Sequence, residues 1–395
     1  LATLRGRVDA LEARTAELEA NQFSTTTKLR GEAIFSVSQA FGDKQAVANG
    51  TPTNNLDSNI TFSNRVRLSL ESSFMGTDVL QTRLNAGNFT SLNTDVTGTP
   101  MTQLGYESVG DNSVAIDKLN YTFNLSEKVR VRIDAVGGEL NENVNVFNPD
   151  FRSSGTGALS RYGRFSPIYR LADDGAGITV NVNPQGALTL SAAYFARGRN
   201  QAANPAIGEG LFDGSSTIFG QLAFKPNKAL NLGFTYAQSY QTADEVNLLG
   251  NTGSATVNIN PAVPVESNNY GLQFTFNPSA KITLGGWAGY TTANTVTGPA
   301  ASADIWYWAA TLGLKDFGRE GNTLGLVFGQ PPKVTGGSGG ITKEASTSYH
   351  LEGLYKMKVS DNILITPGLL VIFNPEHNDK NDTIYVGTLR TTFSF

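Results

Sequence analysis

The chain has 395 residues, of which 16% are charged and 42 are glycine, and its formal net charge is −4. The absence of cysteine excludes disulfides, thiolate metal sites and a cysteine nucleophile. Its 30 basic residues form no patch of the kind that nucleic-acid-binding proteins carry. A membrane-spanning helix needs roughly 20 apolar residues, and the longest charge-free stretch, 282–303, is too rich in Gly, Thr and Pro to supply one.

Residues 1–22 differ in pattern from everything that follows them. Apolar residues recur at heptad spacing with charged residues between them, at Leu1, Leu4, Val8, Leu11 and Leu18. An isolated helix of this length is marginal in water. The pattern therefore predicts one strand of an intermolecular coiled coil, and a lone amphipathic helix packed on the main domain is the alternative.

From Thr27 onward polar and apolar residues alternate, as in the segments 61–74, 128–136 and 269–276. The alternation continues to the last residue. Tyr385, Leu389, Phe393 and Phe395 share one parity, and Thr388, Arg390, Thr392 and Ser394 share the other. This period of two indicates strands with one apolar and one polar face.

The predicted strands are joined alternately by tight polar turns and by long connections. The turns lie at 75–78, 124–128, 183–186, 225–229, 277–281 and 357–362, and the long connections lie near 39–60, 91–113, 139–175, 196–216, 241–267, 293–303, 331–345 and 374–381. About sixteen strands result, and this alternation is typical of an antiparallel barrel of the outer membrane.

Such a sheet must close, because hydrocarbon offers unpaired backbone groups no partner. We therefore expect an all-β fold, in which residues 23–395 form a 16-stranded antiparallel transmembrane β-barrel with lipid outside and an aqueous channel inside. A soluble β-sandwich or propeller is the alternative.

Five arginines of the early strands occupy positions of polar parity, which would face the lumen. They are Arg65, Arg67, Arg83, Arg130 and Arg132. Strands adjacent in sequence are adjacent in a barrel of this kind, so these side chains could form a basic strip that guides ions. Ordinary salt bridges with Glu71 and Asp134 are an equally good interpretation.

The connection 139–175 mixes charged and aromatic residues around Pro167. The residues of interest are Arg152, Arg161, Tyr162, Arg164, Phe165, Tyr169, Arg170, Asp173 and Asp174. Long loops in a compact fold are often functional. We expect this loop to be ordered, to fold into the lumen and to narrow the pore, although packing between subunits is the alternative.

Enzymatic and metal-binding functions have weak support. The two histidines, His350 and His377, could each join a Ser-His-Asp arrangement, but serine and aspartate are so frequent that chance supplies such partners. Glu376, Asp379 and Asp382 suit a solvated acidic loop better than a cation site. The glycine-rich segment 334–340 lacks the Lys-Ser/Thr ending of a phosphate loop. No enzyme activity, cofactor or metal is expected.

Several segments together resemble a family of cyanobacterial outer-membrane porins. These porins join an S-layer-homology domain to a barrel, are related to carbohydrate-selective porins and are often labelled iron-uptake porins. The resemblance rests on the segments 4–35, 64–74, 82–89, 160–170 and 387–395, and it spans nearly all of the chain.

The resemblance implies a homotrimer in the outer membrane with a trimeric periplasmic coiled coil at residues 1–22. It implies passage of inorganic ions, iron included, and poor passage of larger organic solutes. It also implies a peptidoglycan-binding domain upstream of Leu1, outside this chain, and a barrel-assembly signal at Phe393 and Phe395.

The expected function is therefore passive diffusion of inorganic ions and small hydrophilic solutes. One alternative is a sugar-selective channel, in which Tyr162, Phe165 and Tyr169 stack on sugar rings. Another is a structural tether between outer membrane and cell wall.

Overall fold

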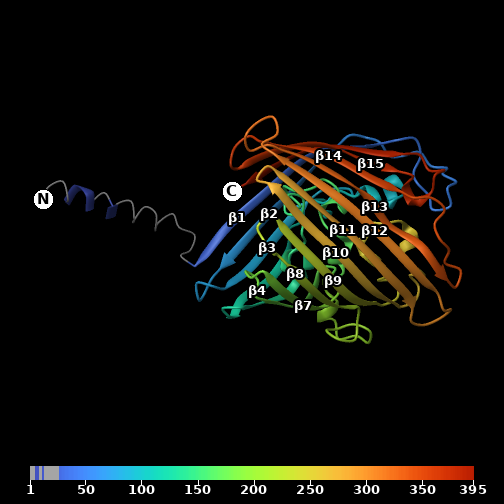
Figure 1. Cartoon of the computed structure of the whole chain (residues 1–395), viewed down its shortest axis with the longest axis horizontal. Helices are drawn as coiled ribbons and strands as arrows, with labels where there is room; N and C mark the ends of the chain where they lie inside the picture. The colour runs from blue at the N-terminus through green and yellow to red at the C-terminus, as the bar shows by residue number, and fades with distance from the viewer. Residues whose placement is uncertain (1–4, 9–10, 13–25) are drawn as a thin grey trace.

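The computed structural model describes residues 5–8, 11–12 and 26–395. Within them, sixteen antiparallel strands form a closed barrel in which each strand pairs with its neighbours in sequence and β1 pairs with β16 (Figure 1). The strands are β1 (Thr27–Phe41), β2 (Thr61–Ser72), β3 (Val79–Gly87), β4 (Ala115–Ser126), β5 (Val129–Gly138), β6 (Gly175–Val182), β7 (Leu188–Ala196), β8 (Ser216–Phe224), β9 (Leu230–Gln241), β10 (Val265–Ser279), β11 (Ile282–Thr295), β12 (Ser302–Lys315), β13 (Thr323–Ser338), β14 (Tyr349–Lys358), β15 (Ile363–Phe373) and β16 (Ile384–Ser394). The predicted fold class is confirmed.

The alternation in the sequence places apolar side chains outside the barrel and polar ones inside it. In β2, Phe62 is 68% exposed whereas the inward-facing Arg65 is 1% exposed. In β16, Leu389 is 43% exposed whereas Arg390 is completely buried. Successive side chains of a strand point to opposite faces, so the barrel presents an apolar outer surface of the kind that lipid requires.

A row of aromatic rings marks one border of this outer surface. Tyr236, Tyr270, Tyr290 and Trp306 lie on neighbouring strands, with successive ring centroids 5.3, 6.4 and 5.0 Å apart. They lie near the strand ends that lead into the long connections. Amphipathic rings in such a row are typical of the boundary between lipid and water.

The barrel closes through the last residue of the chain. Phe395 donates its backbone N–H to Gly31 O at 3.0 Å, and Gly31 N–H donates to Phe395 O at 2.6 Å. Both ends of the strand region therefore lie at the end of the barrel that carries the tight turns (Figure 1). The turn at 316–322 belongs to this set as well, although it is missing from the turns predicted above.

The long connections lie at the opposite end and carry short helices. These are α2 (Thr94–Thr97), η1 (Pro100–Thr102), α3 (Leu140–Asn143), η2 (Tyr162–Arg164), η3 (Pro167–Arg170), η4 (Gln201–Ala203), η5 (Leu248–Gly250), η6 (Ala255–Val257) and η7 (Pro375–His377). Among the described residues, no helix combines the length and apolar character needed to cross a membrane.

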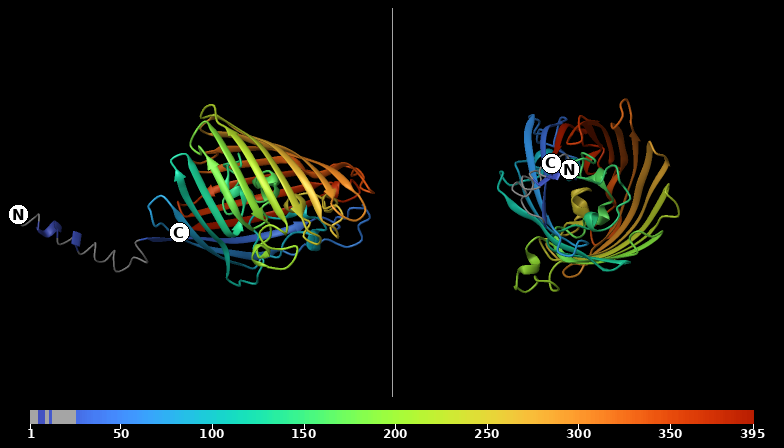
Figure 2. Two further views of the ribbon diagram at one scale, coloured as in Figure 1. Left: turned by 90° about the horizontal axis from the view of Figure 1, so that it is seen from below. Right: turned by 90° about the vertical axis from the view of Figure 1, so that its left-hand side faces the viewer.

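Two connections, 139–174 and 242–264, turn back into the barrel, and they are visible inside the ring of strands in Figure 2. Tyr162 of the first and Leu249 of the second are buried in one apolar cluster with Tyr307 of β12. The interior is therefore filled on the side of the later strands, and the open lumen lies beside the earlier ones.

The structure describes only part of the N-terminal heptad segment. Residues 5–8 and 11–12 are helical, and Val8 and Leu11 are exposed. Leu1, Leu4 and Leu18 lie outside the described residues. The coiled coil thus stays a prediction.

Candidate functional site

The connection 139–174, called the in-folded loop below, is fixed to the barrel wall by a buried carboxylate. Glu352 of β14 accepts hydrogen bonds from the backbone N–H groups of Leu159 at 2.6 Å and Ser160 at 3.3 Å, and also from the Ser160 hydroxyl. His350 Nε2 lies 3.2 Å from the same hydroxyl. Ser160, His350 and Glu352 are completely buried, so this Ser-His-Glu group is closed to solvent and serves to hold the loop.

A buried guanidinium group fixes the same loop from the neighbouring side. Arg390 of β16 donates to the carbonyl oxygens of Ser154, Ala158 and Gly157 at 3.1, 3.2 and 2.7 Å. Charge-assisted hydrogen bonds of this kind are stronger than neutral ones. The wall therefore supplies cations to loop carbonyls that would otherwise lack partners.

Arg65, predicted to line the lumen, belongs to this set of anchors instead. It is 1% exposed, pairs with Glu32 at 2.5 Å and donates to Tyr106 O at 3.2 Å and Ser154 Oγ at 3.1 Å. The in-folded loop covers Arg65, because Ser154 of the loop lies against the inner face of β1 and β2 at this point. Its inward position agrees with the sequence pattern, but it does not face open water.

The aromatic residues of the in-folded loop also point away from the lumen. Tyr162 and Tyr169 are at most 1% exposed, and Phe165 is completely buried. The Tyr162 hydroxyl lies 2.7 Å from Trp308 O and 2.8 Å from Gln330 O, while the Tyr169 hydroxyl donates to Gln221 Oε1 at 2.9 Å. The expectation that these rings could stack on sugars is therefore wrong, because they form the contact between loop and wall.

Three loop arginines bind backbone carbonyls. Arg161 Nε donates to Gly250 O at 2.8 Å, Arg164 Nε donates to Arg152 O at 2.9 Å, and Arg170 donates to Arg161 O. Burial lowers the pKa of Arg164 to about 10, so that side chain is charged at neutral pH. These three residues add positive charge without a directly bonded carboxylate.

A small cavity of about 80 Å³ lies beside the in-folded loop. Asp173 and Asp174 line it together with Arg161 and Arg170. The two carboxylates pair with cations that follow β7. Asp173 lies 3.2 Å from Arg197, and Asp174 lies 3.4 Å from Arg199.

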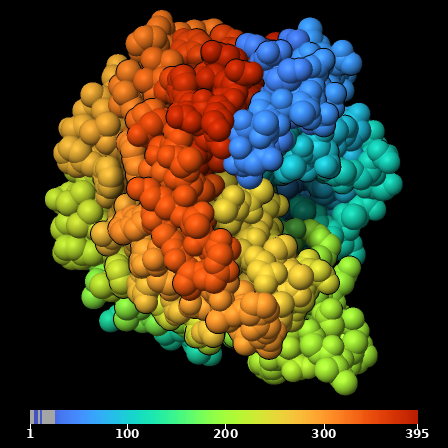
Figure 3. Space-filling model, turned by 90° about the vertical axis from the view of Figure 1, so that its right-hand side faces the viewer, coloured from blue at the N-terminus to red at the C-terminus, as the bar shows by residue number. Residues whose placement is uncertain are grey.

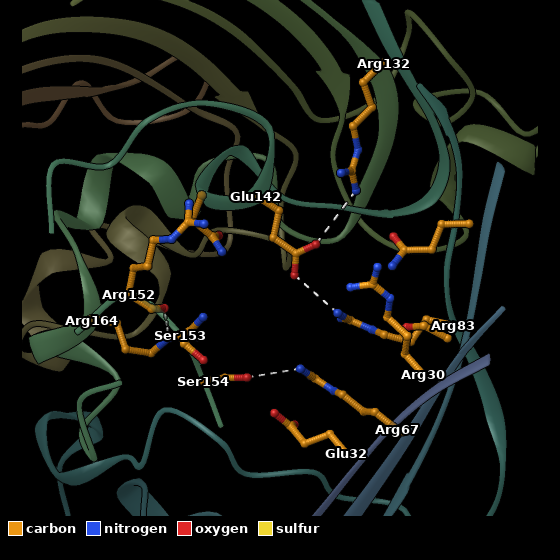
Figure 4. A pocket seen from close by; sticks show the side chains of 14 residues that line it. Arg30, Glu32, Arg67, Arg83, Arg132, Glu142, Arg152, Ser153, Ser154 and Arg164 are labelled. Atoms are coloured by element: carbon orange, nitrogen blue, oxygen red, sulfur yellow. Dashed lines mark hydrogen bonds and ion pairs between the residues drawn. The ribbon is translucent and has the colours of Figure 1, made fainter. Parts of the chain in front are cut away.

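Two adjoining cavities lie between the in-folded loop and the wall, with volumes of about 440 and 470 Å³. Figure 4 shows the first of them. Its charged lining residues are Arg30, Arg67, Arg83, Arg132, Arg152 and Arg164 against Glu32 and Glu142. Those of the second are Arg130, Arg132, Arg152 and Lys225 against Glu142. Cations thus outnumber carboxylates in both.

The acidic residues at the start of the in-folded loop bind the basic wall. Glu142 lies 3.3 Å from Arg83, 3.3 Å from Lys118 and 3.8 Å from Arg132. Glu139 lies 2.8 Å from Lys118. Burial alone would raise the pKa of both carboxyls. Nearby cations outweigh burial, namely Lys118 and Arg164 at Glu139 and Lys118 and Arg83 at Glu142. Both pKa values therefore lie below the usual range.

Two arginines of the lumen have no such partner. Neither Arg130 nor Arg152 makes a side-chain hydrogen bond or ion pair with another residue in the described part of the chain. By contrast, Arg132 pairs with Asp134 at 2.9 Å and Arg83 with Asp117. The basic strip predicted from the sequence is thus partly neutralised by ordinary salt bridges and partly free.

The anchors were missed by sequence reasoning, as was the second in-folded connection, 242–264. Its Leu248, Leu249 and Val257 are buried, and an apolar run in a long connection is the signal that could have found it. Glu352 and Arg390 lie on polar parity, but parity alone does not tell which inward-facing charges a loop will cover.

Comparison with known proteins agrees with this architecture. The model of the carbohydrate-selective porin, OprB family matches residues 1–395. An uncharacterized protein of Nostoc sp. is 42% identical over 420 residues, covering 100% of this chain and 70% of the relative. The structure of Pseudomonas putida OprB at high pH has a TM-score of 0.62 at 14% identity, with 96% of each chain covered.

A trimer form of the outer-membrane protein OmpT of Vibrio cholerae has a TM-score of 0.56 at 10% identity, covering 94% of this chain and 99% of that chain. At such identities the two solved structures show a shared fold, whereas the family match covers the whole sequence. The chain therefore belongs to the carbohydrate-selective porin, OprB family, and its barrel is that of an outer-membrane porin.

Proposed function

We propose that the protein is a passive diffusion channel of the outer membrane for small hydrophilic solutes, and that its lumen favours anions over cations. The lining of the larger cavities carries this proposal. The first cavity has six cationic side chains against two carboxylates, and the second has four against one. Charged groups in a narrow aqueous pore select permeating ions by sign.

Carboxylates behind the lining offset part of this excess. Arg30 pairs with Glu71, Arg67 and Arg83 share Asp117, and Arg132 pairs with Asp134. Glu142 is shared by three cations, and Glu32 is paired with the covered Arg65. Arg130 and Arg152 remain without acidic partners among the described residues. At physiological ionic strength charges are screened over about 8 Å, which is comparable to the spacing of groups across such cavities. We therefore expect a solute beside the unpaired Arg130 and Arg152 to experience a net positive potential.

The in-folded loop is proposed to set the size limit. Its anchors on β14 and β16 hold it across the lumen, and the cavities lie between it and the wall. The basic lining argues against free iron cations as the preferred solute, so the inorganic ions in this proposal are anions. Because the in-folded loop also supplies part of the basic lining, the size and the charge of a permeating solute are selected at the same place in the channel.

The test is the reversal potential of the purified full chain in a planar bilayer under a KCl gradient. We expect chloride to be the more permeant ion, and the double substitution R130Q/R152Q to lower the chloride-to-potassium permeability ratio severalfold. Lys380→Gln is the matched control, because it removes one cation from an exposed position in a connection outside the lumen. A cation-selective wild-type channel would overturn the proposal.

A sugar channel is the second candidate, favoured by the description of the family. The second cavity also carries amide and hydroxyl side chains suited to sugar hydroxyls, namely Asn143, Asn145, Asn181, Gln221, Asn231, Thr122, Thr189 and Ser191. Neither larger cavity, however, has an aromatic residue among its described lining. Saturable block of the ion current by a neutral oligosaccharide would support this candidate over the first.

We also propose that the protein assembles as a homotrimer through its barrel and the heptads of residues 1–22. The trimer form of OmpT, which shares the fold, supports this proposal. The test is the mass of the detergent-solubilised protein, corrected for bound detergent, with and without residues 1–22. The tether role is separable, because deleting this segment should weaken the envelope without changing single-channel conductance if it serves attachment alone.

A further inference from the structure

We propose that the lumen contains a saturable binding site for doubly charged tetrahedral oxyanions, between Arg132 of β5 and Arg152 of the in-folded loop. The ligand class is phosphate or sulfate, either free or as the charged group of an acidic sugar. The inference rests on the proposed function, since it names the substrate class of the same lumen. It adds that these solutes bind while passing, instead of only diffusing through.

The site lies where the two larger cavities meet. Of all their lining residues, only Arg132, Glu142 and Arg152 are common to both cavities. A solute that moves from one cavity to the other must therefore pass these three side chains. Two of them are cations that come from opposite sides, one from the wall and one from the in-folded loop (Figure 4).

Arg132 is oriented by a buried partner and has donors left over. Its Nε lies 2.9 Å from Asp134 Oδ1, and Asp134 in turn accepts a hydrogen bond from Asn143 Nδ2 at 2.6 Å. Its Nη2 is buried and has no hydrogen-bond partner in the described part of the chain. A guanidinium held in place at one edge offers its remaining N–H groups to a ligand with little loss of conformational entropy.

Arg152 faces it with a free side chain on a fixed backbone. Its N–H donates to Asn148 O at 3.0 Å, and its carbonyl accepts from Arg164 Nε at 2.9 Å. The side chain is exposed to the lumen, and Figure 4 shows it entering the cavity opposite Arg67 and Arg83. It can therefore swing towards a solute held at Arg132 without giving up an existing bond.

Glu142 explains why the site should prefer a doubly charged ligand. Its carboxylate is 3.8 Å from Arg132 Nη2, but 3.3 Å from both Arg83 and Lys118. An arriving oxyanion can take over Arg132 while Glu142 stays with the other two cations. The oxyanion must nevertheless approach the negative charge of Glu142, and this repulsion leaves a monoanion little binding free energy. A dianion bonded by two guanidinium groups gains more from attraction than it loses to this repulsion.

The experiment measures channel current through the purified full chain in KCl while sodium sulfate or phosphate is added. We expect saturable block, and block by glucose 6-phosphate but not by glucose at equal concentration. Arg152→Gln should raise the half-blocking concentration roughly tenfold, because it removes one charge-assisted contact. Arg152→Lys should have a smaller effect, since it keeps the charge and loses the planar fork.

Arg152→Gln is the decisive variant because the side chain makes no bond in the described structure that folding could depend on. Arg132→Gln should also weaken block, and a sharp thermal transition near that of wild type would show that it still folds. Lys380→Gln is the control and should leave block unchanged. An anion-selective channel with no saturable block, or with equal block in wild type and Arg152→Gln, would overturn the site alone. A cation-selective channel would overturn the proposed function itself.

Discussion

The carboxylate of Glu376 accepts a hydrogen bond from the backbone N–H of Ala255 at 2.8 Å, and so joins the connections 374–383 and 242–264. Its second oxygen accepts a hydrogen bond from Thr99 Oγ1 at 2.6 Å, which adds a third connection. One buried side chain therefore ties three segments at the end of the barrel opposite the termini. Figure 3 shows this end, where the long connections cover much of the mouth and leave a hollow bordered by the cyan and yellow segments.

A second buried carboxyl lies beside this junction. Glu344 Oε2 accepts a hydrogen bond from Val334 N at 2.7 Å, while its Oε1 and the adjacent Ser254 Oγ have no hydrogen-bond partner among the described residues. The charged groups near Glu344 include Lys333 and Glu376. His377 is neutral, because burial lowers its pKa to about 3.

These carboxyls predict a junction that loosens as pH rises. Burial raises the pKa of Glu344 and of Glu376 from 4.5 to about 7. Between pH 4.5 and pH 7 the folded state therefore binds more protons than the unfolded state. Because of this difference, the free energy of unfolding falls as pH rises from about 4.5 to about 7, and it is level above that. The total effect is on the order of 3 kcal/mol for each carboxyl. We expect amide hydrogen exchange of residues 242–264, corrected for intrinsic rates, to speed up between pH 5 and pH 8.

The double variant E344Q/E376Q is the control for that measurement. It keeps both side chains neutral at every pH, so exchange in 242–264 should lose its pH dependence after the same correction. A pH dependence equal to that of wild type would show that other groups control the junction.

Substitution of Glu352 should release the in-folded loop. Glu352→Ala removes the acceptor of the Leu159 and Ser160 groups, and leaves buried donors unpaired at a cost of about 3 kcal/mol. We expect larger and noisier single-channel conductance and faster proteolysis within 139–174. The exposed Glu320→Ala is the matched control. A variant with wild-type conductance and proteolysis would mean that the remaining anchors suffice.

The difference between what could and could not be predicted follows from the physics of a barrel. Strand parity decides which side chains face inward, and turn length decides which end a connection occupies, so the sixteen strands followed from the sequence. Parity also indicated the inward direction of Arg67, Arg130 and Arg132, which line the two larger cavities. It does not reveal the path of a loop through the interior. That path decides whether an inward residue such as Arg65 or Arg390 is covered or faces water.

The terminal residue offers a separate test of assembly. Deleting Phe395 removes two backbone hydrogen bonds to Gly31, of 2.6 and 3.0 Å, at the seam between β1 and β16. We expect less assembled barrel in the outer membrane, measured as the heat-modifiable band on a gel. Phe395→Ala keeps these backbone bonds and removes only the ring. Normal assembly of Phe395→Ala would contradict the hypothesis that the ring is a recognition signal, and would leave the seam as the cause of any defect in the deletion.

The burial of Tyr162 separates an anchoring role from a sugar-binding role. Its hydroxyl lies within hydrogen-bond distance of Trp308 O and Gln330 O on the wall, at 2.7 and 2.8 Å, and its ring lies 5.7 Å from that of Trp287. Tyr162→Phe keeps the ring and loses the donor, which should cost about 1 to 2 kcal/mol of stability. We expect a lower thermal transition with unchanged ion selectivity and no change in the response to neutral oligosaccharide. A change in sugar response with unaltered stability would place the ring in the lumen, and would contradict the conclusion that it fixes the loop to the wall.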